Sequence, residues 1–408
     1  MNLWVKENRE PMISPHTLTR LGLQIGVASL CRFLLNTARR FPYPFAPALS
    51  RGLGVPLAAV TSLIAVNQVT GLLSLLFGPM ADRWGYRIML FAGLGSLAVG
   101  MLAGGLLPWY VVILIGLFLA GLGKSMFDPA LQAYVGERIP FSRRGMVVGF
   151  METVWAGSTL VGIPLIGLLI AHLGWRAPFL ALGACAVLGM GALWIMIPAG
   201  DAVRCASPVR LDLFGSWKKL LHQKPGLGML GFAFFISVAN DNFFVVYGAW
   251  MEQSFHLSVV ALGLTSTIIG GAELIGETLT ASLGDRLGLQ RSMSSGLLLS
   301  TVSYLILPMV EHSLPGALGV LFSVFLFTEF AIVAALSVST EVMPDARATM
   351  MSGYLAAASA GRVIGAIMGG VVWTLGGLAA VSAVSAGINA LALISFLWGL
   401  RSWTSRGT

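Results

Sequence analysis

A short polar sequence occurs twice in this chain, and the two copies are separated by half its length. The first copy is Asp82-Arg83-Trp84-Gly85 and the second is Asp285-Arg286-Leu287-Gly288, 203 residues later in a chain of 408. Each copy follows one long apolar run and precedes another. Because glycine permits the positive φ angle of a tight reversal, each copy is expected to be a turn between two helices. The repeat therefore predicts two matching halves.

Apolar runs of about 20 residues, the length that spans a bilayer as an α-helix, recur from one end of the chain to the other. The chain is 56% hydrophobic and 10% charged, whereas soluble domains contain about 25% charged residues. The runs lack the alternation expected of β-barrel strands. The sequence predicts an all-α membrane protein with twelve spans, at residues 20–48, 56–80, 88–107, 110–136, 146–171, 178–198, 226–250, 259–283, 292–310, 316–341, 350–374 and 379–400. Residues 1–198 and 226–408 would form two six-helix bundles, joined by a linker at 199–225.

The distribution of lysine and arginine predicts the orientation of these spans. If the N-terminus is cytoplasmic, eighteen of these residues lie in inner loops and tails, and only Arg51 and Arg176 lie in outer loops. Such a bias places both termini on the cytoplasmic side of the plasma membrane. It also explains the net charge of +8 without a nucleic-acid partner. Residues 1–19 are polar and lack a signal-peptide core, so the first span is expected to be retained.

Twelve spans, a central inner loop and an Asp-Arg-x-Gly turn after spans two and eight resemble the major facilitator superfamily over essentially the whole chain. Its twelve-helix drug/proton antiporters are the most similar members. By this resemblance, the two turns would latch neighbouring helices in the outward-facing state; alternatively, they only fix the topology. The residues concerned are Gly78, Asp82, Arg83, Gly85 and Arg87 in the first copy, and Asp285, Arg286 and Gly288 in the second, where Ala281 replaces the leading glycine.

Glycines recur at helical spacing in spans five and eleven. Gly361, Gly365 and Gly369 place a small residue at every fourth position, which predicts a face for close helix packing. In span five, the residues Gly157, Gly162, Pro164 and Gly167 only loosely resemble the Gly-Pro motif of the superfamily's antiporters. Packing alone is the other explanation for them.

Eleven ionisable residues fall inside the predicted spans. A charged side chain near the centre of a membrane helix costs about 2.5–3.5 kcal/mol, so these groups are expected to face one another or water. Spans three, six, nine and twelve contain none, and in the superfamily those four helices pack outside the central cavity. The eleven residues are Arg32, Arg39, Arg40, Lys124, Asp128, Glu152, Asp241, Glu273, Glu277, Glu329 and Arg362.

Two groups of polar residues are candidates for lining a substrate cavity. In span one, Arg32, Asn36, Arg39 or Arg40, and Tyr43 recur every three to four residues and form one stripe. In span seven, Asn240, Asp241 and Asn242 need hydrogen-bond partners at mid-membrane. Alternatively, the arginines pair with buried acids and only support the fold. Three aromatic residues are expected either to contact an aromatic solute or to pack: Trp155, Tyr247 and Trp250.

The 203-residue offset suggests which charged residues pair. It places Asp241 opposite position 38, which predicts an outer gate pair with Arg39 or Arg40. It places Glu329 opposite position 126, close to Lys124, which predicts a second pair; the alternative is that Lys124 bridges Asp128 one turn away. Glu273 and Arg362 are expected to form a static ion pair, because spans eight and eleven are neighbours in the superfamily. Because Glu277 lies one turn from Glu273, the two carboxylates disfavour each other's charged form. The candidates for proton coupling or gating are Lys124, Asp128, Glu152, Asp241, Glu273, Glu277, Glu329 and Arg362.

The resemblance implies a monomeric secondary transporter that moves a small organic solute by alternating access, with proton-coupled efflux as the first hypothesis. One alternative is uptake or facilitated diffusion of an organic anion along the arginine stripe. Another is a receptor or assembly factor of the same fold that moves nothing. The sequence has no complete Gly-x-x-x-x-Gly-Lys-Ser/Thr phosphate-binding loop, because Phe118 stands where the first glycine would precede Gly123-Lys124-Ser125, and it has no Cys or His spacing typical of a metal site. We therefore expect no enzyme activity, no metal and no cofactor.

Overall fold

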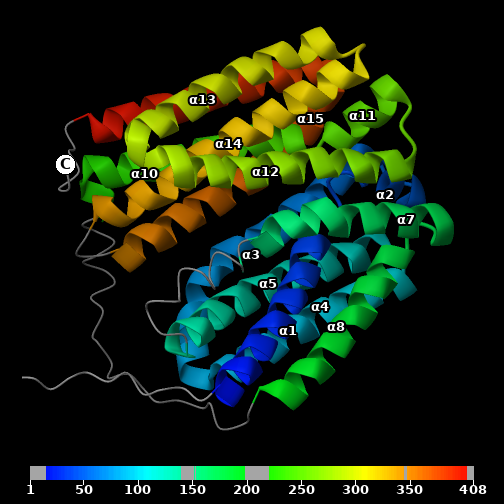
Figure 1. Ribbon diagram of the computed structural model, residues 1–408. Coiled ribbons are helices and arrows are strands. Elements are labelled where there is room, and N and C mark those ends of the chain that lie inside the picture. Colours follow the sequence, from blue (N-terminus) through cyan, green and yellow to red (C-terminus); the bar gives the residue numbers. More distant parts are fainter. Residues whose placement is uncertain (1–14, 139–150, 152, 198–219, 344–346, 402–408) are drawn as a thin grey trace, which may run out of the picture.

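The computed structural model describes residues 15–138, 151, 153–197, 220–343 and 347–401 (Figure 1). Glu152 and most of the predicted linker, up to residue 219, lie outside the described residues. The structure also does not describe the side chains of Asp82, Arg83 and Asp285 or how deeply Gly78 is buried.

Helices from the first half of the chain form one bundle, the lower one in Figure 1. Its fifth span, Thr153–Leu173, contains a π-helical turn between two α-helical parts. The elements are α1 (Pro15–Arg40), α2 (Ala46–Leu53), α3 (Leu57–Trp84), α4 (Tyr86–Leu106), α5 (Tyr110–Arg138), the π-helix η1 (Ser158–Gly162), α7 (Ile163–Leu173) and α8 (Ala177–Met196).

Helices from the second half form the other bundle. Its elements are α10 (Lys224–Phe244), α11 (Tyr247–Phe255), α12 (Val259–Leu287), α13 (Leu289–Ile306), the 3₁₀-helix η2 (Leu307–Val310), α14 (Leu314–Val342) and α15 (Arg347–Leu400). The backbone of α15 leaves the helical conformation at Gly376 and Gly377. Eleven described helices are long and apolar enough to cross a membrane. Because α15 contains two of the predicted spans, the twelve-span, all-α prediction is confirmed.

The first and seventh spans are each broken into two helices, which the sequence did not predict. The predicted span 20–48 ends as a helix at Arg40, and α2 begins only at Ala46. Pro42 and Pro44 lie in the intervening turn, where they need no helical hydrogen bond from their nitrogens. The predicted span 226–250 is likewise divided, since α10 ends at Phe244. The two breaks lie at matching positions in the halves.

The repeat read from the sequence also matches other element boundaries. When α12 is moved back by 203 residues, it falls on residues 56–84, and α3 occupies Leu57–Trp84. The glycines of the two repeated turns have φ angles of 91° at Gly85 and 82° at Gly288. This confirms that both turns use the positive φ that only glycine adopts readily.

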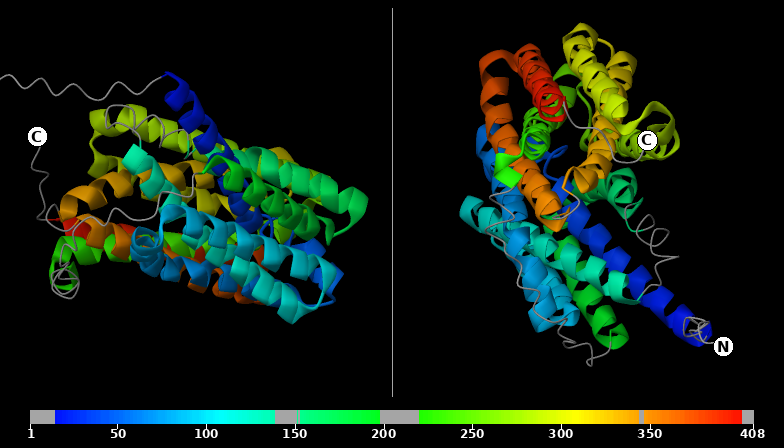
Figure 2. Two further views of the ribbon diagram at one scale, coloured as in Figure 1. Left: turned by 90° about the horizontal axis from the view of Figure 1, so that it is seen from below. Right: turned by 90° about the vertical axis from the view of Figure 1, so that its left-hand side faces the viewer.

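The two bundles lie side by side and meet at the end of the molecule opposite the chain termini (Figures 1 and 2). The elements that touch across the boundary are α3 with α15, α12 with η1 and α7, and α2 with α11. Glycines bring these elements close together: a Cβ on Gly263 of α12 would lie 3.3 Å from the Cα of Pro164. The boundary between the bundles is therefore tightly packed at this end.

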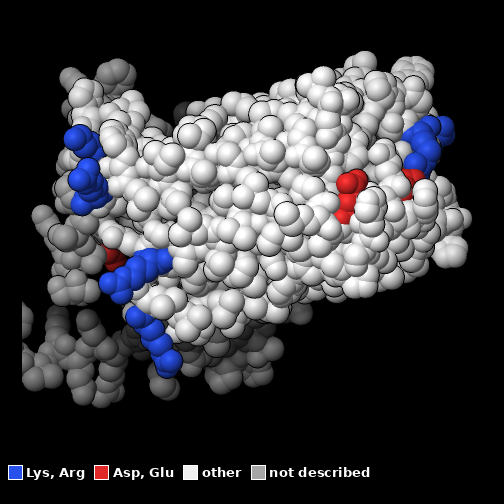
Figure 3. All heavy atoms as spheres, turned by 90° about the horizontal axis from the view of Figure 1, so that it is seen from above, with Lys and Arg blue, Asp and Glu red and all other residues white. Residues whose placement is uncertain are grey.

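The outer surface carries large apolar side chains, among them Leu188, Trp194, Ile195, Leu305 and Ile394, all more than half exposed. On the face drawn in Figure 3, the charged side chains gather toward the two ends of the molecule. An apolar belt between charged ends is what a bilayer requires of a protein that spans it.

Candidate site between the two bundles

A buried ion pair joins the two bundles. Arg40, the last residue of α1, donates from Nη1 to Oε2 of Glu273 at 2.9 Å, and its Nη2 pairs with Oε1 of the same carboxylate. Arg40 is 6% exposed and Glu273 is 3% exposed. A guanidinium that donates two parallel hydrogen bonds to one carboxylate is among the strongest polar contacts in proteins. This pair is the centre of the candidate site.

The π-helical turn of the fifth span completes the surroundings of Arg40. Its Nη1 also donates to Oγ1 of Thr159, at 2.5 Å. The Arg40 guanidinium lies 4.3 Å from the ring centre of Trp155, within cation–π range. A Cβ on Gly270 of α12 would lie 3.1 Å from the Cβ of Thr159, so a glycine there lets α12 approach this turn. Single π-helical turns often mark functional positions in helices.

A second connection between the bundles is a chain of four buried side chains. Arg39 donates to Oε1 of Gln68, and the Nε2 of Gln68 donates to the hydroxyl of Tyr43 at 2.7 Å. The Tyr43 hydroxyl donates in turn to Oδ1 of Asp241, also at 2.7 Å. Every bond in this chain, which we name the Arg39–Asp241 chain, points from the first bundle toward the carboxylate in the second. The Tyr43 ring also stacks on Phe244, with ring centres 4.3 Å apart.

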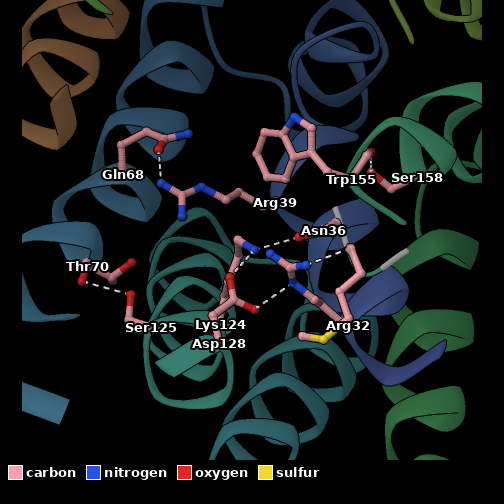
Figure 4. A network of polar contacts seen from close by, with 11 residues as sticks. Arg32, Asn36, Arg39, Gln68, Thr70, Lys124, Ser125, Asp128, Trp155 and Ser158 are labelled. Carbon is pink, nitrogen blue, oxygen red and sulfur yellow. Dashed lines mark hydrogen bonds and ion pairs between the residues drawn. The ribbon is translucent and has the colours of Figure 1, made fainter. Parts of the chain in front are cut away.

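A third polar cluster lies entirely within the first bundle (Figure 4). Lys124 donates to Oδ2 of Asp128 and to Oδ1 of Asn36, each at 2.5 Å. Arg32 contacts the other oxygen of Asp128 at 3.3 Å and donates to the carbonyl of Met151 at 2.6 Å. These residues connect α1 with α5 and with the start of the fifth span. The cluster therefore stabilises one bundle and does not bridge the two.

Three carboxylates gather where α12 packs against α14. A Cβ on Gly276 would lie 3.0 Å from the Cβ of Glu329, which brings Glu329 beside the stretch of α12 that holds Glu273 and Glu277. The three acids act on one another electrostatically, and the charge of Arg40 reaches Glu329 as well. Arg362 of α15 is half-buried and acts on Asp241 and Glu329 through space.

The structure decides between the predicted charge pairs. Of the two pairs predicted from the repeat, Asp241 accepts a hydrogen bond from Tyr43 and is connected to Arg39 through the chain described above. Lys124 binds Asp128, which was the alternative prediction, and not Glu329. The ion pair predicted between Glu273 and Arg362 is wrong, because Glu273 pairs with Arg40.

The asparagines and aromatic residues are divided between the site and the packed core. Asn242 is fully buried and donates to Ser385 Oγ and to the Val381 carbonyl of α15, so it does not line a cavity. The Oδ1 of Asn240 is buried and has no hydrogen-bond partner among the described residues. Of the three aromatic candidates, only Trp155 lies at the ion pair; Tyr247 and Trp250 are fully buried in the core.

The described part of the first repeated turn connects two helices of the first bundle. Arg87 donates to the Trp194 carbonyl at 3.4 Å and stacks over the Trp194 ring at 4.5 Å, which ties α4 to α8. Arg286 is exposed. The latch role itself stays a prediction.

Two residues of the site were missed by the sequence analysis. Gln68 and Thr159 are uncharged, and only charged residues of the spans were counted as costly to bury. Gln68 follows Asn67 inside an apolar run, so an adjacent pair of amides was the available signal. The described residues hold no group of three His, Cys, Asp or Glu side chains placed to bind a metal ion.

Two bundles of membrane-spanning helices that are joined at one end through a buried ion pair are typical of a membrane transport protein. A family model described as the Major Facilitator Superfamily matches residues 28–239 and 229–407. The chain belongs to this superfamily and, like its relatives, is a transporter and not an enzyme.

Similar proteins include a multi-drug resistance efflux pump PmrA homolog of Lactococcus lactis. It is 24% identical, and the match covers 90% of this chain and 91% of the relative. The multidrug resistance protein MdtG of Citrobacter koseri is 26% identical over 89% of this chain and 91% of its own. The crystal structure of a bacterial homolog to the human lysosomal transporter Spinster, inward-facing and unoccupied, superposes with a TM-score of 0.71. It shares 16% identity and covers 94% of this chain and 95% of its own, so it shows the same fold.

Proposed function

We propose that this transporter exports a small organic solute in exchange for protons, by alternating access between the two bundles. The buried Arg40–Glu273 pair is the observation that carries this proposal. It joins the two bundles, both of its members are buried, and Glu273 can bind a proton.

Glu273 is the proposed coupling acid because its charge holds this end of the molecule closed. An ionised carboxylate accepts both hydrogen bonds from Arg40, whereas a protonated one leaves the guanidinium buried without a counter-charge. Breaking a buried pair in this way costs about 3–5 kcal/mol. Proton binding at Glu273 would therefore favour separation of the bundles at this end. Glu277 and Glu329 interact electrostatically in the same region, so they are further candidates to take up a proton.

The orientation that fits this proposal places both termini in the cytoplasm of the cell that carries the protein in its plasma membrane. The excess of basic residues in alternate loops supports it. The structure would then be closed on the outer side and correspond to an inward-facing state. We further propose that residues 1–198 and 226–408 act as the two moving domains, that 199–225 links them, and that one chain is the working unit.

Reconstituted vesicles test the function directly. Proteoliposomes with a lumen at pH 6 are diluted into buffer at pH 7.5 that contains a panel of fluorescent organic dyes, ethidium among them. An exporter whose cytoplasmic side faces the bath will accumulate at least one dye in the lumen, and nigericin will abolish the accumulation. The Glu273→Gln variant will lose accumulation driven by the gradient.

The matched control is Glu341→Gln, which removes an exposed carboxylate at the far end of α14. It should accumulate dye like the wild type. Dye movement that ignores the gradient, or that survives in Glu273→Gln with full gradient dependence, would refute Glu273 as the coupling acid.

Transport of an organic anion is the second candidate function. The contacts of the buried Arg39 favour it. The Arg39 guanidinium donates to the neutral amide of Gln68, and no carboxylate among the described residues forms an ion pair with it. Anion flux that is independent of a proton gradient and collapses in Arg39→Gln would establish this alternative.

A further inference from the structure

The π-helical turn of the fifth span follows from a proline near its end. Pro164 has no N–H to donate to the carbonyl of Leu160, four residues earlier, and its ring would clash with that carbonyl in a regular α-helix. The backbone is wider here, and the N–H of Ile163 bonds to the carbonyl of Ser158, five residues back. The sequence therefore places an irregular turn around Thr159.

This turn is held against α1, the helix that carries Arg40. A Cβ on Gly162 would overlap Oγ1 of Thr37, so the glycine lets the turn pack on α1 about one helical turn before Arg40. The start of the fifth span is connected to α1 as well, because Arg32 donates to the Met151 carbonyl at 2.6 Å. The π-helical turn and Arg40 therefore move together as parts of the first bundle.

Arg40 has partners in both bundles, and they differ in charge. In its own bundle, its Nη1 donates to Oγ1 of Thr159 at 2.5 Å, and its guanidinium lies 4.3 Å from the ring centre of Trp155. Both of these partners are neutral. In the other bundle, the guanidinium pairs with the carboxylate of Glu273. When the bundles separate, Glu273 is the partner that leaves.

The two neutral partners contribute most once Glu273 is uncharged. A guanidinium paired with a carboxylate already has its charge compensated. An unpaired one depends on the acceptors and the aromatic ring that remain, and both kinds of contact are stronger for a desolvated charge than for a compensated one. Thr159 and Trp155 therefore stabilise the separated state more than they stabilise the closed state.

We propose that Thr159 and Trp155, which we name the arginine cradle, keep Arg40 on the first bundle after Glu273 binds a proton and thereby set the pH at which the bundles separate. Both are positioning residues, because neither binds the proton. The inference rests on the proposed role of Glu273 as the coupling acid. The opposite role is a clamp: residues that only fastened the ion pair would stabilise the closed state and oppose separation.

Other charged or titratable groups also act on Arg40, Glu273 or their neighbours. They are Glu277 on α12, Glu329 on α14, Asp241 on α10, Tyr247 on α11, Tyr43 after α1, Lys124 on α5 and, through Glu329, Arg362 on α15. All of them stay in place when Thr159 is changed. Lys124 lies 5.2 Å from the ring centre of Trp155, so a change at Trp155 also affects Lys124. Substitution of Thr159 is therefore the cleaner test.

The distance between two spin labels at the closed end tests the cradle without a transport assay. The labels are attached to Leu173→Cys and Met309→Cys, in a variant whose native cysteines are replaced by alanine. Both positions are more than two-thirds exposed, and there is one in each bundle. The full-length protein in lipid nanodiscs is measured from pH 5 to pH 9. The population with the longer distance should grow as the pH falls, and its midpoint reports proton-driven separation.

Thr159→Val removes the acceptor oxygen and keeps the shape of the side chain. The midpoint should move toward acid by about one pH unit, because the separated state loses an acceptor for a charged donor while the closed state keeps Glu273. Thr159→Ser should restore the midpoint of the wild type. Trp155→Leu should shift it in the same direction, and Trp155→Phe by less. Thr374→Val is the control, since Thr374 is exposed and its hydroxyl bonds within its own helix.

A second background tests the cradle without a proton. In Glu273→Gln, the guanidinium has lost its charged partner at every pH, so the longer distance should be populated throughout the range. Adding Thr159→Val to this variant should reduce that population.

The direction of these changes decides between the cradle and the clamp. A midpoint that stays the same or moves to higher pH in Thr159→Val, with no loss of the longer distance in the Glu273→Gln background, would overturn the cradle and leave Glu273 as the coupling acid. A wild-type distance that ignores pH would refute Glu273 as the coupling acid. The cradle would then be judged by the Glu273→Gln background alone.

Discussion

Arg39 and Arg40 are consecutive residues with different partners, and this difference organises the site. Successive residues of an α-helix point about 100° apart. Arg40 therefore faces α12 of the other bundle and binds Glu273, while Arg39 faces α3 of its own bundle and binds Gln68. The bundles are connected directly by one arginine, and indirectly by the other through Gln68 and Tyr43.

Within the Arg39–Asp241 chain, the hydrogen bond from the Tyr43 hydroxyl to Asp241 is the one that joins the two bundles. Tyr43→Phe leaves the buried carboxylate of Asp241 without its donor and the Gln68 amide without its acceptor. We expect a loss of about 1–3 kcal/mol in the free energy of unfolding. The loss is measured by titrating the detergent-solubilised protein with a denaturing detergent.

A double-mutant cycle with Asp241→Asn separates the chain from general packing. Tyr43→Phe and Asp241→Asn should be non-additive by about 0.5–3 kcal/mol, because the Tyr43 hydroxyl stabilises the charge that Asp241→Asn removes. Tyr110→Phe is the matched control, since the Tyr110 hydroxyl bonds to the Ala59 carbonyl inside the first bundle. Its effect should add to that of Asp241→Asn. Additivity in both cycles would show that Tyr43 and Asp241 do not act together.

The helices α10 and α15 pack closely against each other, and the glycines predicted from the sequence make this possible. A Cβ on Gly365 would lie 2.6 Å from the Val238 carbonyl and 3.0 Å from the Cβ of Asp241. Gly361 and Gly369 pack on the same helix one turn away on either side. The small-residue face of α15 therefore also sets the position of Asp241 in the site.

Gly365→Leu should destabilise the protein because its side chain would meet backbone atoms of α10. Overpacking of this kind costs about 1–3 kcal/mol, with the upper end expected where backbone must move. Gly387→Leu is the control: Gly387 is exposed, and a Cβ there meets no atom within 4 Å. Thermal unfolding in detergent should show a clear loss for the first variant and little change for the second. Equal stability of the two would contradict the packing role.

The pattern of apolar runs, glycines and buried charges was sufficient to predict the helices and this packing face, but not the partners in the site. A repeat of 203 residues aligns the backbone of one half with the other. The repeat does not determine where a side chain points. A shift of one residue in the alignment rotates the side chain by about 100° around the helix axis. Asp241 was thus assigned to Arg39 or Arg40, although its partner Tyr43 lies beyond the end of α1, where helical spacing no longer applies.

At the scale of the whole molecule, the two bundles touch at one end and the first and seventh spans break there. Besides the short helices α2 and α11, the elements in contact between the bundles are α3 with α15 and α12 with the fifth span. For a transporter that alternates between two states, these contacts must separate once in every cycle. A covalent bond across them should therefore stop transport while leaving each bundle intact.

Thr61 of α3 and Gly370 of α15 provide the position for such a bond. A Cβ on Gly370 would lie 3.2 Å from the Cβ of Thr61, a few tenths of an ångström short of the usual disulfide separation of about 3.5–4.5 Å. In a background without native cysteines, the Thr61→Cys/Gly370→Cys variant should lose dye transport on oxidation and regain it on reduction. A matched cross-link within the second bundle, Gly296→Cys/Ala331→Cys, joins α13 to α14 and should leave transport intact, because that bundle moves as one body. Full transport after complete cross-linking of Thr61→Cys to Gly370→Cys would show that the bundles do not need to separate at this end.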